Sequence, residues 1–458
     1  MRVAVVGTGV SGLSAVWILK KYSDHEVNVY ERNAVAGPAQ LEVAVDGKEG
    51  VRLDAYPLTV AASDAAARAF LADASVPLRP AASGLSASRD GHPLWSAGDW
   101  RSLSLADALS PRAWRLALDV ARWESSGATG SGTLAAFLEN EGYSRALFDD
   151  YLLPRIAASF LTPSAEAAFA LPASAVLARL SAARSARLAL SGADLASSVG
   201  ATLPSYNLHT ATNIAAISSH DAGVTLTEAG GQQHVYDHVV LALPGATALQ
   251  LLQAGGWASE EERVALAGRG QADAVVRFRP GSGTSVDCWT TPPAYGGTET
   301  GVAASPSFAL GRGVALTVYP HDGDVGALVR ESVPLPPVDA GAAAALAAVQ
   351  NTRRISFVGA HAHDVGSALA SATEVLSRLN ATPPYPAQAA LSPPSALTLR
   401  ALRLAVVLAD TARRATAPLF FVIGWPVAFA LAVVGRVAGL LGLRDINAAA
   451  TKLGTEWA

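Results

Sequence analysis

The sequence predicts an α/β protein with three parts. These are a Rossmann-like dinucleotide-binding domain that is discontinuous in sequence, an inserted α+β substrate domain and a hydrophobic helical tail at the C-terminus. The chain begins with an apolar strand that runs into a G-x-G-x-x-G turn. Strand-like segments return in residues 205–252 and 353–360. A proline-rich stretch then separates the largely apolar residues 399–458 from the rest of the chain.

Length and composition bound the classes of function. A chain of 458 residues is long enough for about two or three domains. Half of the residues are hydrophobic, 16% are charged and the mean hydropathy is +0.28, which is apolar for a soluble enzyme and directs attention to segments that could contact a membrane. The net charge of −4 argues against a nucleic-acid partner. Because Cys288 is the single cysteine, no intrachain disulfide can form, and we expect a buried thiol.

The first stretch of the chain reads as strand, glycine turn and helix. Residues 3–6 are an apolar run typical of a buried strand, and a helix is expected over about 11–21. Gly7 permits the tight turn, Gly9 lets a pyrophosphate approach the backbone, and Gly12 lets the helix pack closely on the strand. The pattern therefore predicts a site for the pyrophosphate of a dinucleotide.

The N-terminus of this helix and the next strand complete the predicted site. A phosphate beside Val10 and Ser11 would meet free N–H groups and the positive end of the helix dipole. Residues 27–30 form the second strand, and Glu31 follows it about 20 residues after the glycines, where a carboxylate can bind ribose hydroxyls. The alternative is a structural turn without a ligand, but the full order of elements favours a nucleotide.

The residues after the second strand carry a family resemblance. Glu31, Arg32, Gly37 and the later Asp54 resemble the flavin-containing amine oxidases and the phytoene-desaturase-like FAD oxidoreductases. The resemblance implies that Glu31 binds the adenosine ribose of FAD, that Arg32 lies beside the phosphates and that Gly37 belongs to a phosphate-contacting loop. Pro38 stands where the family has a second glycine, and proline brings no N–H to a phosphate.

Residues 61–191 are alanine-rich and helical in period. Tryptophans at positions 95, 100, 114 and 123 are spaced among apolar residues. Residues 134–154 resemble the helical substrate cap of one amine-oxidase-like subgroup, and the segment around Trp95 resembles a strand of the same subgroup. These aromatic residues either line a tunnel for an apolar substrate or form the ordinary core.

Short strands are predicted again in the middle of the chain. Residues 208–214 and 224–227 alternate in hydropathy, and residues 237–243 form a buried strand. By resemblance, Ile214 contacts the adenine through its backbone. Residues 274–333 contain further strands, which we expect to form the floor sheet of the substrate domain.

The last part of the predicted nucleotide domain resembles the family's C-terminal flavin motif. An apolar strand over 353–360 contains Gly359, and a helix is expected from about 366 to 379. The resemblance implies that Gly359 and Asp364 contact FAD. The loop between the strand and the helix is shorter than is common in the family.

That loop also contains two histidines. His361, His363 and Asp364 are clustered, but three groups in one loop make a poor metal site, so we predict no metal. His363 is a weak candidate for an acid/base residue near the flavin. The alternative is that these residues cap the helix.

A proline-rich linker over 381–398 leads into a tail over 399–458, of which residues 399–408 are amphipathic. Residues 415–435 carry no charge and are about long enough to cross a bilayer, whereas arginines precede them. We expect this tail to attach the protein to a membrane, with the FAD-binding domain on the cytosolic side. The alternative is a pair of core helices covering an apolar groove. Because the first predicted strand begins at Arg2, we expect no signal peptide.

The predicted FAD-binding domain comprises residues 1–60, 195–250 and 350–380, and the substrate domain comprises 61–194 and 251–349. The resemblance implies an FAD-dependent oxidoreductase in which flavin N5 accepts a hydride from an apolar, lipid-like small molecule. Two alternatives remain open. One is a flavin- or nucleotide-binding accessory protein without turnover, and the other is NAD(P) in the first site.

Overall fold

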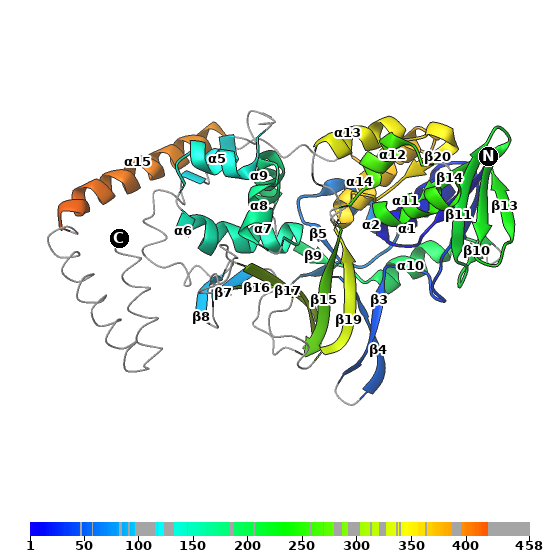
Figure 1. Ribbon diagram of the computed structural model, residues 1–458, viewed down its shortest axis with the longest axis horizontal. Coiled ribbons are helices and arrows are strands. Elements are labelled where there is room, and N and C mark those ends of the chain that lie inside the picture. The colour runs from blue at the N-terminus through cyan, green and yellow to red at the C-terminus, as the bar shows by residue number, and fades with distance from the viewer. Residues whose placement is uncertain are drawn as a thin grey trace. The chain divides into compact units, whose positions relative to one another are not determined.

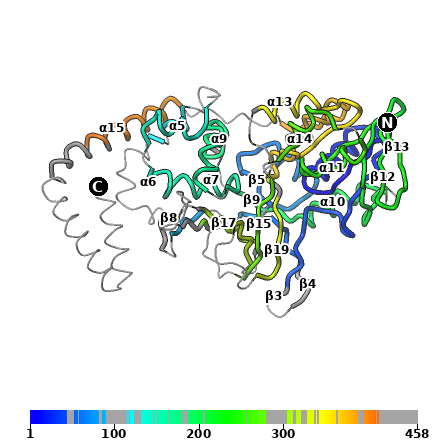
Figure 2. The backbone as a smooth tube through the Cα atoms, in the orientation of Figure 1, coloured from blue at the N-terminus to red at the C-terminus, as the bar shows by residue number. Residues whose placement is uncertain are grey.

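The computed structural model describes residues 1–419 except at 46–47, 57, 82–84, 90–91, 97–114, 117, 123–131, 144, 163, 183–186, 205–206, 257, 269, 279–285, 292–302, 312–313, 320–326, 336–337, 339, 362–363 and 387–394. The chain divides into two compact units (Figures 1 and 2). The first comprises Met1–Gly98 and Thr129–Leu391, and the second comprises Asp99–Ala128 and Ser392–Ala458.

A five-stranded parallel sheet forms the centre of the first unit. Its strands, in spatial order, are β10 (Leu208–His209), β2 (Glu26–Tyr30), β1 (Arg2–Val6), β14 (His238–Leu241) and β20 (Ile355–Phe357). Every pairing between them is parallel. The predicted Rossmann-like sheet is therefore present, and it joins segments that are far apart in the sequence.

Successive residues of the central strand point to opposite faces of this sheet, because the side chains of a strand alternate. Val3 and Val5 pack into one core cluster, whereas Ala4 and Val6 pack into another. All four residues are buried. A strand covered on both faces needs apolar residues at every position, which explains the unbroken apolar run.

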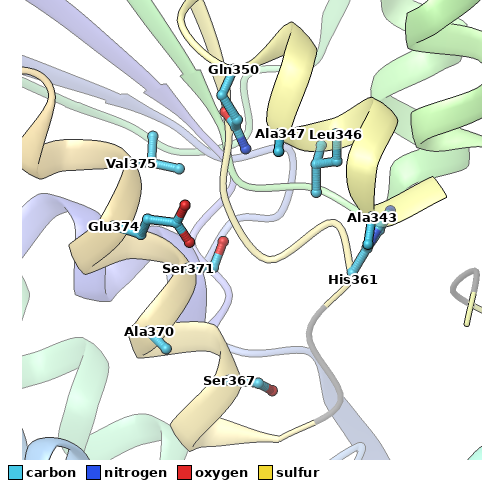
Figure 3. A pocket seen from close by; sticks show the side chains of 10 residues that line it. All are labelled: Ala343, Leu346, Ala347, Gln350, His361, Ser367, Ala370, Ser371, Glu374 and Val375. Atoms are coloured by element: carbon cyan, nitrogen blue, oxygen red, sulfur yellow. The ribbon is translucent and has the colours of Figure 1, made fainter. Parts of the chain in front are cut away.

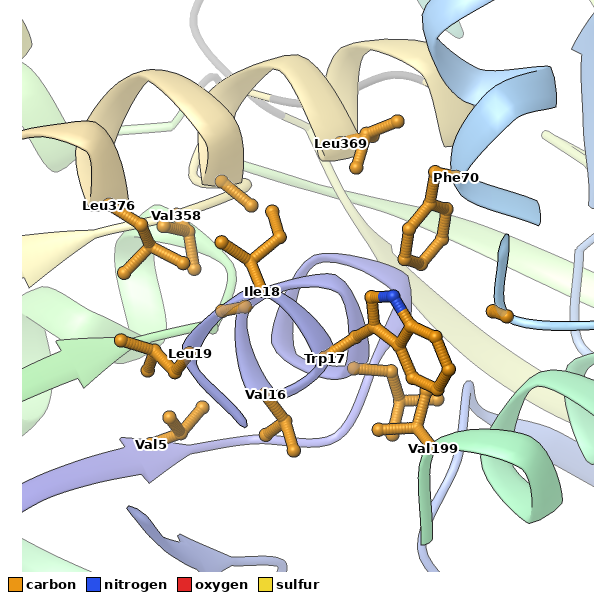
Figure 4. Packing of buried hydrophobic residues seen from close by; sticks show 14 of the residues in the cluster. Val5, Val16, Trp17, Ile18, Leu19, Phe70, Val199, Val358, Leu369 and Leu376 are labelled. Carbon is orange, nitrogen blue, oxygen red and sulfur yellow. The ribbon is translucent and has the colours of Figure 1, made fainter. Parts of the chain in front are cut away.

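Helices α1 (Val10–Tyr22) and α14 (Val365–Ser377) cover one face of the sheet, with α2 (Ala65–Asp73) and α10 (Gly192–Gly200) beside them. Ile18 of α1 and Leu369 and Leu376 of α14 are almost completely buried in the shared core (Figure 4). Both helices start close to the predicted bounds. This packing fixes the glycine turn, because α1 begins directly after it.

The other face is covered by a three-stranded antiparallel sheet and three helices. The elements are β11 (Ile214–His220), β12 (Gly223–Glu228), β13 (Gln233–Tyr236), α11 (Gly245–Ala254), α12 (Glu260–Leu266) and α13 (Ala340–Val349). Their apolar side chains form one cluster with Ala4, Val6 and Leu241 of the parallel sheet. A short 3-10 turn, Thr352–Arg354, then leads into β20.

The prediction of one strand over residues 208–214 was wrong. β10 ends at His209, Ala211 has a φ of +53°, and β11 begins at Ile214 in a different sheet. The chain leaves the parallel sheet because the amides of Ala211 and Thr212 donate to the carbonyl oxygens of Asn33 and Glu31, both at 2.9 Å. Alternating hydropathy could not reveal this break.

A seven-stranded sheet contains the strands predicted in residues 274–333. Its order is β19 (Ala327–Pro334), β15 (Gln271–Phe278), β18 (Val314–Val318), β17 (Ala303–Gly311), β16 (Val286–Thr291), β7 (Leu85–Arg89) and β8 (His92–Ser96). Cys288 is buried in β16, as predicted. The hairpin β3 (Gln40–Val45) and β4 (Lys48–Asp54) packs Leu41 and Val43 against this sheet.

Residues 61–191 are less helical than predicted. The region contains β7 and β8, and a small sheet formed by β5 (Thr59–Ala61), β9 (Arg187–Ala189) and β6 (Arg79–Pro80). Its described helices include α2, α5 (Leu134–Asn140), α6 (Arg145–Leu147), α7 (Leu153–Phe160), α8 (Ala165–Phe169) and α9 (Ala173–Ala182), with a π-helical turn over Phe148–Leu152. Alanine favours helices locally, but pairing with β16 and β5 decides the strands. Trp95 lies in β8, whereas Trp100, Trp114 and Trp123 lie outside the described residues.

The second unit contains the helix α15 (Ala396–Leu419). In the part of the chain that the structure describes, no helix is both long and apolar enough to cross a membrane. Most of the predicted uncharged segment, residues 415–435, lies outside the described residues, so its membrane insertion stays a prediction.

Candidate dinucleotide-binding site

The three glycines of the turn have different structural reasons. Gly7 has a φ of +99°, and a Cβ there would lie 2.5 Å from the carbonyl oxygen of Ala242. A Cβ at Gly12 would lie 2.0 Å from the carbonyl oxygen of Gly7. The protein's own packing therefore requires glycine at both positions.

Gly9 is different, because a Cβ there would have no atom within 4 Å. Its φ of −59° is accessible to any residue. It is the N-cap of α1, and the first intrahelical bond runs from the amide of Leu13 to the carbonyl of Gly9 at 2.9 Å. The amides of Val10, Ser11 and Gly12 precede that bond and are oriented toward the N-terminus. The open space beside Gly9 thus has the position and electrostatics that a pyrophosphate needs.

The Glu31 carboxylate at the end of β2 is buried, with 6% of its surface exposed. Its Oε2 accepts from the Thr8 amide at 3.1 Å and from Thr8 Oγ1 at 2.5 Å. Its Oε1 accepts from the Asn33 amide at 2.8 Å. The carboxylate predicted to bind the ribose is therefore held against the glycine turn.

Thr8 also connects the turn to the loop that contains Gly37. The amide of Gly37 donates to Thr8 Oγ1 at 2.9 Å, and Gly37 has a φ of +142°, which favours glycine. Arg32 is exposed, and Pro38 is buried. Thr8 was not predicted from the sequence, because the residue between the first two glycines of the turn carries no recognised signal.

The segment predicted to contact the adenine lies at the same end of β2. The bonds from Ala211 and Thr212 to the backbone of Asn33 and Glu31 hold the turn that leads to Ile214. Ile214 is 6% exposed. The structure thus brings the turn before Ile214 to the end of the strand that carries Glu31.

The other predicted anchors lie around the start of α14. Gly359 has a φ of +73°, and its amide donates to Ser371 Oγ at 3.1 Å. Asp364 is the N-cap of α14, and its carboxylate accepts from the Ser367 amide at 2.9 Å. His363, the candidate acid/base residue, lies outside the described residues.

An ion-pair cluster surrounds Asp364. Its carboxylate lies 3.4 Å from the guanidinium of Arg179 and 3.9 Å from that of Arg187. Desolvation raises the pKa of the Asp364 carboxyl, but the Ser367 hydrogen bonds and the two arginine charges outweigh it, so the pKa lies below its ordinary value. Asp64 is also close, because a Cβ at Gly366 would lie 2.3 Å from its Oδ2.

Neither arginine nor Asp64 was predicted from the sequence as part of the site. Their local signal is limited to charged residues within an otherwise alanine-rich stretch. Arg187 also donates to Thr59 Oγ1 at 2.9 Å, across the pairing of β5 and β9. The cluster therefore ties α14 to α9 and to this small sheet.

A separate cavity of about 290 Å³ lies between α13 and α14 (Figure 3). Ser371 and Glu374 line it from α14, and His361 lines it from the loop before that helix. His361 Nε2 donates to the carbonyl oxygen of Ala265 at 2.7 Å. The cavity is on the α13 side of α14, whereas Leu369 and Leu376 pack toward α1. It is therefore distinct from the site at the glycine turn.

Comparison with known proteins supports the nucleotide-binding character of the N-terminal region. Residues 5–74 match the model of the NAD(P)-binding Rossmann-like domain family. These residues include the glycine turn, α1 and Glu31. No curated protein matches the sequence.

Solved structures share the fold over most of the chain. The CLA-producing fatty acid isomerase from P. acnes has 15% identity and a TM-score of 0.57, with 82% of this chain and 98% of that chain covered. Cyclohexylamine oxidase from Brevibacterium oxydans has 15% identity and a TM-score of 0.55, with coverage of 82% and 99%. Wild-type putrescine oxidase bound to putrescine has 13% identity and a TM-score of 0.55, with coverage of 82% and 98%. The resemblance to the amine-oxidase-like group is thus confirmed at the level of the fold, which this chain shares with these enzymes.

Proposed function

We propose that this protein is an FAD-dependent, amine-oxidase-like oxidoreductase that removes a hydride from an apolar substrate at a membrane surface. The observation that carries the proposal is the pairing of open space at Gly9 with the buried carboxylate of Glu31. The protein's own packing does not require glycine at position 9, because a Cβ there would have no atom within 4 Å, whereas a bound pyrophosphate would require it. The shared fold supports the same conclusion.

The residues of the chain would hold FAD at three places. The first-turn amides of α1 would bind the pyrophosphate, and Glu31 would accept a hydrogen bond from the adenosine ribose. The N-terminal end of α14, after Gly359, would face the flavin end. When bound, the flavin would supply a hydride acceptor at N5. The protein would supply position and exclusion of water.

We propose an apolar, lipid-like small molecule as the substrate. The support is the chain's composition and its shared fold with enzymes named for a fatty acid and for amines. Fold alone leaves the chemistry open, so a panel of alkyl amines and unsaturated fatty acids is the appropriate first screen.

We also propose that the tail attaches the protein to a membrane, with the FAD-binding domain on the cytosolic side. Leu397, Leu404 and Leu408 recur on one face of α15 and are 78%, 58% and 59% exposed. Arg400 and Arg403 are exposed on the same helix. A helix with exposed leucines and arginines binds the interface of anionic lipids.

Fractionation in the absence of detergent tests whether the tail attaches the protein to a membrane. The full chain is expected to float with vesicles that contain anionic lipid, and a version that ends at Ala396 is expected to stay in solution. A full chain with Leu404→Ser and Leu408→Ser is the matched control for loss of the apolar face alone. Equal solubility of the full and shortened chains would show that the tail is not an anchor.

Purification tests the cofactor. The protein is expected to be yellow, to release FAD on denaturation and to rebind FAD when the apoprotein is reconstituted. Bleaching of the flavin absorbance by one member of the substrate panel would support turnover. Colourless protein that takes up no FAD would contradict the proposal.

The alternative is a flavin- or nucleotide-binding accessory protein without turnover. Pro38 and the short loop after Gly359 favour it, because both depart from the pattern of the family. It predicts bound FAD that no substrate reduces. Binding of NAD(P) in place of FAD would instead support the other alternative, and titration of the apoprotein with each dinucleotide separates them.

A further inference from the structure

We propose that Thr8 is a positioning residue for the nucleotide, whose hydroxyl fixes both the Glu31 carboxylate and the Gly37 loop in the form that binds the adenosine ribose. The inference rests on the proposed function, because it names how that site holds its ligand. Thr8 is 1% exposed, so its hydroxyl is buried among protein groups.

The hydroxyl of Thr8 makes two short bonds with opposite roles, and the carbonyl oxygen of Gly37 lies farther from it, at 3.5 Å. The hydroxyl donates to Glu31 Oε2 at 2.5 Å and accepts from the Gly37 amide at 2.9 Å. A hydroxyl has a single proton to donate, so the bond to Glu31 uses it completely. One side chain therefore joins the glycine turn, the end of β2 and the loop of Gly37.

These bonds determine which part of the Glu31 carboxylate meets the ribose. A carboxylate has about four acceptor positions, and the amide and hydroxyl of Thr8 occupy two of them on Oε2. The Asn33 amide occupies a third on Oε1. The remaining position is on Oε1, so the ribose hydroxyl is expected to bind there.

The bond from the Gly37 amide to Thr8 explains why the loop of Gly37 tolerates a proline at position 38. The amide of Gly37 is directed at Thr8 and is used inside the protein. Pro38 has no amide to offer. The loop therefore serves to hold Thr8 and Glu31, and the pyrophosphate depends on the first turn of α1.

The decisive variant is Thr8→Val, which keeps the shape of the side chain and removes the hydroxyl. It leaves the Gly37 amide without its acceptor and removes one of the two Thr8 bonds to Glu31 Oε2, so that only the backbone amide of residue 8 still holds this oxygen. FAD binding must then order the carboxylate, which costs binding free energy. The dissociation constant for FAD is expected to rise by roughly tenfold to a hundredfold. Thr8→Ser keeps the hydroxyl and is expected to bind within about threefold of wild type.

Thr162→Val is the matched control. Thr162 is fully buried, and among the described residues its Oγ1 has no hydrogen-bond partner. The same substitution there is expected to leave FAD affinity unchanged. The thermal unfolding of each apoprotein is measured beside the titrations, and Thr8→Cys replaces Thr8→Val in every comparison if the latter does not fold.

A double-mutant cycle with Glu31→Gln separates positioning from a general structural role. If Thr8 acts through the carboxylate, Thr8→Val in the Glu31→Gln background is expected to weaken FAD binding by less than about threefold. The positioning role would be overturned if the two substitutions raised the dissociation constant for FAD independently, so that their fold-changes multiplied in the double variant. It would also be overturned if Thr8→Val alone left the affinity for FAD unchanged. Wild-type protein that binds no FAD would instead overturn the proposed function itself.

Discussion

Trp17 and Tyr385 are 368 positions apart in the sequence, yet the indole Nε1 of Trp17 donates to the hydroxyl of Tyr385 at 3.1 Å. Tyr385 in turn donates to Asp73 Oδ2 at 2.8 Å. Its ring makes edge contacts with Tyr22 and Phe70. The start of the proline-rich linker is thus fixed on α1 and α2.

The Tyr385 hydroxyl is expected to stabilise the folded protein. Tyr385→Phe keeps the ring but removes two hydrogen bonds, so the free energy of unfolding is expected to fall by about 1–3 kcal/mol. Tyr22→Phe is the control, because it removes the 2.7 Å bond from Tyr22 to Asp73 but leaves the bonds of the Tyr385 hydroxyl to Trp17 and Asp73, and should cost less. Urea denaturation measures both. Equal stability of Tyr385→Phe and wild type would show that the linker is not held by this hydroxyl.

Substitutions at Gly9 and Gly12 are expected to have different effects, one on FAD binding and the other on folding stability. Gly9→Leu places a side chain in open space, so the apoprotein is expected to fold while FAD affinity falls by more than about a hundredfold. Gly12→Ala is expected to destabilise the apoprotein, because its Cβ would lie 2.0 Å from the Gly7 carbonyl oxygen. Gly200→Leu, at another open position, is the matched control. If Gly9→Leu bound FAD as tightly as wild type, the pyrophosphate could not lie beside Gly9 and that assignment would be wrong.

His238 is expected to make stability depend on pH between about 6.5 and 4. Burial, with the charges of His25 and Arg354, lowers its pKa from 6.5 to about 4, and its ring bonds Ser356 Oγ at 2.6 Å. The unfolded chain binds this proton first as the pH falls, so stability is lost across that range, by at most about 3 kcal/mol. His238→Gln is expected to remove this component of the pH dependence. An NMR titration that places the His238 pKa near 6.5 would contradict it.

The charge of Asp364 is expected to stabilise the folded protein at neutral pH but not in acid. Asp364→Asn keeps an N-cap for α14 but removes the charge that faces Arg179 and Arg187, so about 1–2 kcal/mol of stability is expected to be lost at pH 7. Because the folded pKa of Asp364 is lowered, the wild type holds this contribution above pH 3.8 and loses it as the pH falls through the folded value.

The difference between Asp364→Asn and wild type is therefore expected to shrink below pH 3.8. Asp221→Asn is the control, since Asp221 is an exposed residue beyond β11. Thermal unfolding across the pH range measures both variants. A difference that stays constant from pH 7 into acid would show that the ion pairs contribute nothing.

The first 32 residues could be predicted well because their signals are local. An apolar run, glycines at fixed spacing and a charged residue at the end of the next strand all lie within one strand–helix–strand unit. The break between β10 and β11 could not be predicted. It depends on backbone bonds to Glu31 and Asn33, which are distant in the sequence.

The sequence by itself determined the local parts of the candidate site: the glycine turn, the helix after it and the position of Glu31 after β2. Only the tertiary structure decided which glycine is spare for a ligand, that Thr8 holds Glu31, and that Arg179 and Arg187 surround Asp364. The physical reason is the distance along the chain over which each kind of interaction acts. Turn geometry and hydropathy act between neighbours along the chain, whereas buried hydrogen bonds and ion pairs join whichever groups the packed sheets and helices bring together.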